Sequence, residues 1–152
     1  MTEPELPVDA GVLLFPLTIE RRAIVCELEV DGDPVPWARA GRSARGRAYT
    51  PARQRDWAEH VGWAIRQAYT GPPLEVELGV WLTFRRQTRR HADVDNLCKA
   101  VLDAGTGIAW ADDAAITLLL ARVLVDPDAP GLELVVYRRQ LEVDTLEAPA
   151  GL

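Results

Sequence analysis

Carboxylates and one lysine are concentrated in a short stretch of the second half of the chain. Asp93 and Asp95 are two residues apart and follow an apolar run, and Lys99 comes four residues after Asp95. In an extended backbone the two aspartates would point the same way, with Cα atoms roughly 6–7 Å apart. On a helix, Lys99 would share a face with Asp95. Carboxylates at this separation can hold one hard cation such as Mg²⁺, or a pair of cations.

More carboxylates follow in the next 20 residues or so. Asp103 lies another four residues along the expected helix. Asp112 and Asp113 precede an apolar run that we expect to form a strand beside the one before the first aspartates. Taken singly, each has a structural alternative: Asp95 as a helix cap, Lys99 with Asp103 as a surface ion pair, and the aspartate pair as a polar turn. Either member of that pair could face a metal, with Asp113 the better candidate.

Phosphodiester cleavage is the chemistry that this combination predicts. The reaction needs the phosphate charge neutralised, a water activated and the leaving oxygen stabilised, and metals held by several carboxylates can do all three. A lysine can set a positive charge against the transition state. Lys99 is the only lysine among 17 basic residues, and lysine differs from arginine in being a compact charge with a tunable pKa. The alternative is a coding preference for arginine with one lysine left over.

Basic residues are unevenly distributed along the chain. The net charge is −6, yet residues 39–99 hold 12 basic and 6 acidic residues, a local net of +6, and the flanks carry 5 basic and 17 acidic residues. A basic middle can form a phosphate-binding face, although surfaces can also be patchy by chance. We predict contacts with the phosphates of a nucleic acid for eight arginines of this middle segment: Arg39, Arg42, Arg45, Arg47, Arg85, Arg86, Arg89 and Arg90.

Other kinds of protein are not favoured. There is no P-loop, dinucleotide-binding, serine-hydrolase or C-x-x-C motif, and two histidines are too few for a histidine-based metal site. No apolar run approaches the roughly 20 residues of a membrane helix, and no secretory signal is expected. Cys26 and Cys98 do not form a disulfide framework. A cytoplasmic setting is therefore expected.

The patterning predicts one α+β domain. Residues 23–30, 74–84, 115–125 and 132–138 are typical of strands, and helices are expected from about Thr50-Pro51 to Gly71 and from Asp95 to about Ala104. Residues 31–46, rich in glycine and proline, are expected to form a loop. The order β-α-β-α-β-β predicts a mixed sheet with two main helices on one face. We divide the chain into an extension at 1–22, a nuclease domain at 23–140 and a loose acidic tail at 141–152.

The motif around the first aspartates resembles that of the RusA family of Holliday junction resolvases (crossover junction endodeoxyribonucleases). The resemblance covers roughly residues 26–138. It rests on the following residues: Asp93-Val94-Asp95-Asn96-Leu97-Cys98-Lys99, Asp103-Ala104, Gly107, Trp110, Asp112-Asp113, Gly32-Asp33-Pro34-Val35-Pro36 and Tyr49-Thr50-Pro51.

The resemblance implies a Mg²⁺-dependent homodimer that nicks four-way DNA junctions, with Mn²⁺ as a possible substitute. It implies metal binding by Asp93, Asp95 and Asp113 and a catalytic role for Lys99, with Asp103 and Asp112 in support. Three alternatives stay open: a less selective metal nuclease, a DNA-structure-binding dimer without turnover, and a domain whose aspartates are structural.

Overall fold

The structure, a computed structural model, describes residues 12–14, 17–19, 21–39, 41–90, 92–139 and 142–144. Its centre is a four-stranded sheet in the order β3-β8-β6-β7. The strands are β3 (Ile24–Asp31), β6 (Leu78–Arg86), β7 (Ile116–Val125) and β8 (Gly131–Arg138). β7 runs parallel to β6, while β8 is antiparallel to both β3 and β6. The expected mixed sheet is confirmed, and β7 lies beside β6 as predicted.

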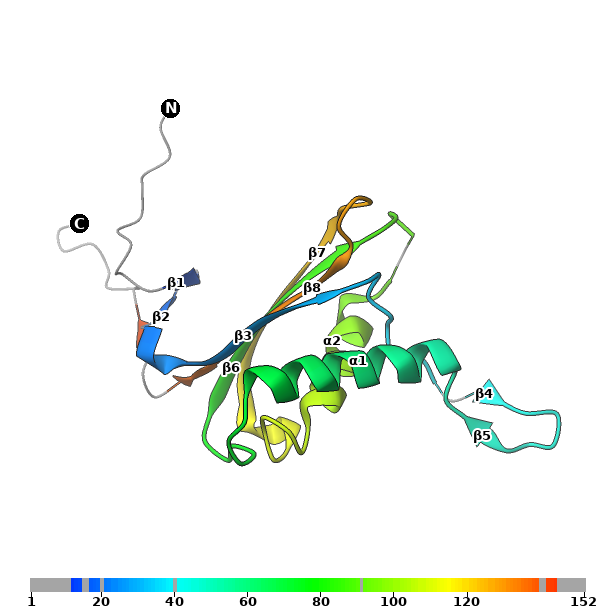
Figure 1. Cartoon of the computed structure of the whole chain (residues 1–152), viewed down its shortest axis with the longest axis horizontal. Coiled ribbons are helices and arrows are strands. Elements are labelled where there is room, and N and C mark those ends of the chain that lie inside the picture. Colours follow the sequence, from blue (N-terminus) through cyan, green and yellow to red (C-terminus); the bar gives the residue numbers. More distant parts are fainter. Residues whose placement is uncertain are drawn as a thin grey trace, which may run out of the picture.

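Two helices lie on the same side of this sheet (Figure 1): α1 (Ala52–Ala68) and α2 (Val94–Gly105). α1 buries Trp57, Val61 and Ile65, which recur at helical spacing. These side chains join the alternate residues of β6, from Leu78 to Phe84, in one hydrophobic core. The two helices on one face confirm the predicted α+β class. Within the described part of the chain, no helix is both long and apolar enough to cross a membrane.

Small elements surround the main sheet at opposite ends of the molecule (Figure 1). β1 (Val12–Leu14), β2 (Leu17–Ile19) and β9 (Glu142–Asp144) form a three-stranded sheet, and β4 (Gly41–Arg42) pairs with β5 (Ala48–Tyr49) in a hairpin. The 3-10 helices η1 (Arg21–Ala23) and η2 (Asp113–Ala115) precede β3 and β7.

Two sequence expectations about these elements were wrong. The tail was expected to be loose, but its residues 142–144 pair with β2, so that the two flanks of the main domain meet. The segment 31–46 was expected to be a loop, but its residues 41–42 form a strand of the arginine-bearing hairpin. Residues 1–11 of the extension and 145–152 of the tail lie outside the described residues.

The last turn of α2 is fixed by a tryptophan that crosses it. The indole Nε1 of Trp110, fully buried, donates to the carbonyl of Leu102 and lies within hydrogen-bonding distance of Thr106 Oγ1, both at 3.2 Å. A Cβ on Gly105 would overlap the Trp110 ring, because the ring packs directly against this glycine. The contact anchors the end of the helix that carries Lys99 and Asp103.

Gly105→Ala is expected to lower the free energy of unfolding by about 2–3 kcal/mol, because Trp110 must move out of a packed site. Gly62→Ala, also in a helix, is the matched control. Its Cβ would meet Ala104 O and Ile108 Cδ1 at an ordinary 3.5 Å, so a gain of about 0.5–1 kcal/mol is expected. Urea denaturation followed by tryptophan fluorescence measures both. Equal effects of the two changes would contradict this packing.

Candidate functional site

The first two aspartates straddle the start of α2. Asp93 is the N-cap residue, with φ −68° and ψ 126°, and Asp95 lies in the first turn of the helix. The expectation of a shared extended backbone was therefore wrong: the strand ends at Arg86, and the helix has already begun at Val94. Asn96 connects the two aspartates, since its Nδ2 donates to Asp93 Oδ2 at 3.4 Å and its N–H to Asp95 Oδ1 at 2.9 Å.

A hollow of about 500 Å³ lies where α2 passes over β7. Three carboxylates and the lysine line it: Asp95, Lys99, Asp103 and Asp113. Its floor is apolar and includes Leu119 and Ala121 of β7. Asp113 reaches the hollow because η2 leads into β7 directly beside the helix. Asp93 is not one of the lining residues and lies at the N-terminal end of α2.

Lys99 is held by two neighbours. Its Nζ lies 3.1 Å from Asp103 Oδ2, one helical turn along, and 5.2 Å from the centre of the Trp37 ring. The N–H of Trp37 donates to Asn96 O at 2.9 Å, which ties the segment before β4 to α2. A cation over an aromatic face is attracted to it. Trp37 was missed by sequence reasoning, because nothing in the local pattern shows that residue 37 packs near residue 99.

The two neighbouring aspartates of η2 differ in their contacts. Asp112 caps η2, since its Oδ1 accepts from the N–H of Ala114 at 2.8 Å. Asp113 is exposed and lines the hollow, whereas Asp112 does not. This difference supports Asp113 as the metal-binding member of the pair and leaves Asp112 with a capping role.

The donor set of the hollow suits a hard cation. Carboxylate oxygens are the ligands that Mg²⁺ prefers, and Mg²⁺ usually keeps several of its waters and takes only one or two carboxylates from the protein. Within the described ranges, no three histidine, cysteine, aspartate or glutamate side chains lie close enough together to hold one ion directly. The residues therefore fit a largely hydrated Mg²⁺ better than a fully protein-enclosed one.

Cys98 lies between the carboxylates on the buried side of α2. Burial raises the pKa of its thiol to about 11, and the negative charge of Asp95 adds to the rise. At neutral pH the thiol is therefore protonated, and it presents an uncharged wall to the hollow, of which it is a lining residue. Cys98 belongs to the hydrophobic core, as does Cys26.

Two of the eight predicted DNA-binding arginines, Arg85 and Arg86, do not line the hollow, and their guanidinium groups pair with carboxylates. Arg86 is only 8% exposed, its guanidinium lying 3.8 Å from Asp33 and donating to Arg90 O at 3.3 Å. Arg85 lies on the opposite sheet face, where it pairs with Glu133 and Glu29. Consecutive strand residues point to opposite faces, so one phosphate cannot be gripped by both. We remove Arg85 and Arg86 from the DNA-contact set.

The other arginines of the set lie outside the core. Arg89 and Arg90 are exposed directly after β6, and Arg39, Arg45 and Arg47 are exposed in and before the β4–β5 hairpin. Arg42 belongs to β4, but its side chain lies outside what the structure describes. The hairpin projects beyond the N-terminal end of α1 (Figure 1). The exposed guanidinium groups are thus at the margins of the molecule rather than in the hollow.

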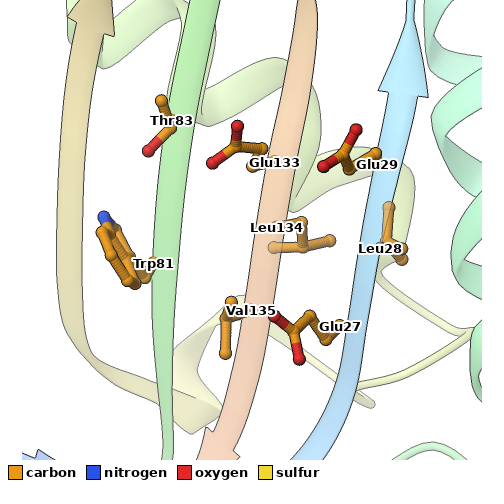
Figure 2. Close-up of a pocket in the computed structure, with 8 residues that line it drawn as sticks. All are labelled: Glu27, Leu28, Glu29, Trp81, Thr83, Glu133, Leu134 and Val135. Carbon is orange, nitrogen blue, oxygen red and sulfur yellow. The ribbon is translucent and has the colours of Figure 1, made fainter. Parts of the chain in front are cut away.

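The far face of the sheet is unsuited to phosphate. Figure 2 shows three glutamates of β3 and β8 rising from this face, with Trp81 and Thr83 of β6 beside them. The glutamates are Glu27, Glu29 and Glu133. Because like charges repel, a nucleic acid is expected on the side that carries α2 and not on this one.

A comparison with known families decides the family of the chain. The family model described as Endodeoxyribonuclease RusA matches residues 31–137, more than half of the chain. This protein belongs to the RusA family. A similar relative is the protein named Crossover junction endodeoxyribonuclease RusA from Aquifex aeolicus (strain VF5), which is 31% identical over 78 residues. The match covers 51% of this chain and 62% of that relative, so the chain spans less than two thirds of the relative's length.

The part of the chain that matches the RusA family contains every residue of the hollow. It extends from the end of β3 to the end of β8 and includes both helices, but it leaves out β1, β2 and β9. Trp37, Lys99 and Asp113 all fall within it. The three-stranded sheet of the flanks thus lies outside the matched RusA region.

Proposed function

We propose that this RusA-family chain is a Mg²⁺-dependent endodeoxyribonuclease that resolves Holliday junctions or other branched DNA in recombination and repair. The proposal rests above all on the hollow beside α2, where Asp95, Lys99 and Asp113 meet within the matched region. Carboxylates that hold a metal, with a cation beside them, can carry out phosphodiester hydrolysis. Mn²⁺ has similar ligand preferences and is expected to substitute for Mg²⁺.

Asp93, Asp95 and Asp113 are proposed to hold a largely hydrated metal, in part through its bound waters, with Asp103 and Asp112 in supporting roles. A bound Mg²⁺ would neutralise the phosphate and lower the pKa of a bound water. Asn96 supports both aspartates of the helix start through its donors. Asp103 supports the site through its ion pair with Lys99, and Asp112 does so by fixing the turn that presents Asp113.

Lys99 is proposed to act on the phosphate. Its side chain is about half exposed, and its ammonium can reach an oxygen of a bound phosphate without leaving the hollow. The carboxylate of Asp103 and the ring of Trp37 both contact the ammonium and fix its position. A preorganised positive charge of this kind stabilises the charge that develops on the phosphate oxygens in the transition state.

DNA would lie across α2, and five exposed arginines would hold it: Arg39, Arg45, Arg47, Arg89 and Arg90. These contacts go to phosphates, which position DNA without reading its sequence. Because phosphate contacts are alike in junctions and duplex, a less selective metal nuclease is the second candidate. A homodimer suits a four-way junction, since each of two sites can cut one of two symmetric strands. The cytoplasmic setting stays a prediction.

A cleavage assay with two DNAs of equal arm length tests this function. The wild-type protein is incubated in Mg²⁺ with a labelled four-way junction and with a linear duplex, beside Asp113→Asn at the same concentration. Paired nicks in the junction, absent from the duplex and from Asp113→Asn, are the expected result. Equal cutting of both DNAs would favour the less selective nuclease. Binding without cutting would leave a DNA-binding dimer without turnover and overturn the proposal.

A further inference from the structure

A second cavity, which we call the α1 groove, lies between α1 and the last turn of α2. It has a volume of about 510 Å³. Leu102 and Asp103 line the hollow, whereas the next residue, Ala104, lines the α1 groove, so that a single turn of helix separates the two. Gly62 and Ile108 supply further apolar surface to the groove. Both cavities therefore flank the helix that carries Lys99.

A highly exposed tryptophan lines the α1 groove. Trp63 is 64% exposed, the largest exposed fraction among the large apolar side chains of the described residues. It is two residues from Val61 and two from Ile65, which are both fully buried, so it points away from the core. Apolar surface that is exposed beside a cavity and rimmed by polar residues marks an interaction site.

The polar residues of the groove favour a nucleic acid as its occupant. Arg55, Glu59, Trp63 and Arg66 are all exposed and recur at three- or four-residue spacing, so they form one stripe along α1. Neither arginine pairs with a carboxylate among the described residues, so both guanidinium groups are available to phosphates. Between them the indole offers an aromatic face on which any base can stack. Glu59 can accept a hydrogen bond from an amino group of that base.

The dimensions of the stripe suit a short stretch of single strand. From Arg55 to Arg66 the helix rises roughly 16 Å, the length of about five stacked nucleotides at about 3.4 Å each. α1 and α2 lie on the same side of the sheet (Figure 1), so a strand that leaves the hollow across α2 reaches the α1 groove. A helix with its side chains is about 10–12 Å wide, a distance that about three or four stacked nucleotides span.

We propose that the α1 groove holds an unpaired nucleotide of the DNA substrate, with its base stacked on Trp63 and neighbouring phosphates against Arg55 and Arg66. This inference rests on the proposed function and adds a contact that distinguishes unpaired from paired strands. The bases of a duplex already stack on one another, so a base must leave the stack before it can lie on the indole. Branched DNA supplies unpaired bases near the branch point, whereas a linear duplex does not.

Equilibrium binding in chelator, where no cleavage is expected, tests the stacking. Fluorescence anisotropy compares a duplex that carries a single-stranded flap as long as the stripe with a fully paired duplex of the same number of nucleotides. The full-length wild type is expected to bind the flap DNA about 10-fold more tightly. Trp63→Ala and Trp63→Leu are expected to lose this preference, because neither side chain has an aromatic face, whereas Trp63→Phe is expected to keep it. Circular dichroism establishes that the variants are folded.

Salt dependence separates the phosphate contacts from the stacking. Arg66→Gln is expected to weaken the binding of both DNAs and to lower the slope of log Kd against log salt by about 0.7–0.9, the loss of one phosphate contact. Trp63→Ala is expected to leave that slope unchanged. Arg21→Gln is the matched control, since Arg21 is an exposed arginine of η1 that does not line the groove, and it should bind both DNAs as the wild type does.

Three outcomes would overturn the inference. They are a wild type that binds the two DNAs equally, a Trp63→Ala or Trp63→Leu protein that keeps the preference for the flap, and an unchanged salt slope in Arg66→Gln. A Trp63 that affects the binding of another protein but not of DNA would give the second outcome. Because the assay measures binding, a wild type that prefers the flap but cuts no DNA would refute the proposed function and leave the base-stacking groove standing.

Discussion

Asp113→Asn is expected to slow junction cleavage by at least about 10³-fold, a loss of roughly 4 kcal/mol of transition-state stabilisation. Asp113 is exposed in η2 and lines the hollow with Asp95 and Lys99. Asparagine keeps the size of the side chain but removes the negative charge that would hold the metal. Single-turnover cleavage of a labelled junction in Mg²⁺ measures the effect, and a gel-shift assay in Ca²⁺ or chelator shows whether DNA binding survives.

The neighbouring aspartate supplies a matched control. Asp112 accepts a hydrogen bond from the N–H of Ala114, and asparagine caps such a turn about as well as aspartate, so Asp112→Asn is expected to change the rate by less than about 3-fold. The two changes are the same in chemistry and adjacent in sequence. If Asp112→Asn abolished cleavage and Asp113→Asn did not, the assignment of the two aspartates would be reversed.

Lys99→Met is expected to slow cleavage by about 10²–10³-fold with little loss of DNA affinity. Methionine fills much of the same volume but carries no charge towards the phosphate. Stability should hardly change, because the Lys99–Asp103 pair is about half exposed and such pairs contribute roughly 0–1 kcal/mol. Single-turnover rates at saturating protein separate the chemical step from binding.

Lys99→Arg tests whether the compact ammonium matters or only its charge. Arginine presents a planar fork that cannot occupy the place of a point charge between Asp103 and Trp37. We expect it to recover less than about a tenth of the wild-type rate. Arg21→Met, an exposed cation in η1 away from the hollow, is the control for the loss of one positive charge. Full activity of Lys99→Met would exclude a catalytic role for Lys99.

The elements with strong periodicity were predictable from the sequence. Alternate apolar residues from Leu78 to Phe84 lie in the core as expected, and the helix predicted from Asp95 to about Ala104 was found at Val94–Gly105. Periodicity works here because burial on one face of a strand or helix imposes it directly on the sequence. The four-residue spacing of Lys99 and Asp103 likewise predicted the ion pair between them.

Features that depend on contacts between distant parts of the chain were not predictable. The pairing of β2 with β9 joins the two flanks, and the packing of Trp37 near Lys99 joins the loop before β4 to α2. Neither leaves a pattern within a short window of sequence. Arg85 and Arg86 are different, because the predicted strand ended at residue 84 whereas β6 continues to Arg86. Once the strand includes both arginines, its period of two places them on opposite faces.

The place of the first aspartates shows how a small error in an element boundary changes a site. A strand reaching Asp93 would have set Asp93 and Asp95 side by side. The helix begins at Val94 instead, so Asp95 lines the hollow while Asp93 occupies the N-cap position, without a side-chain capping hydrogen bond. The proposed metal site therefore depends on Asp95 and Asp113 more than on Asp93, and Asp93→Asn should be the mildest of the three asparagine changes.

The dependence of junction cleavage on Mg²⁺ concentration tests the central proposal most directly. The wild-type protein is stripped with chelator, and single-turnover cleavage of one labelled four-way junction is followed as Mg²⁺ is added. We predict no cleavage in chelator and a rate that rises with Mg²⁺ to a plateau, as a carboxylate-held cation requires. Undiminished cleavage in chelator, or no cleavage at any Mg²⁺ or Mn²⁺ concentration, would contradict it.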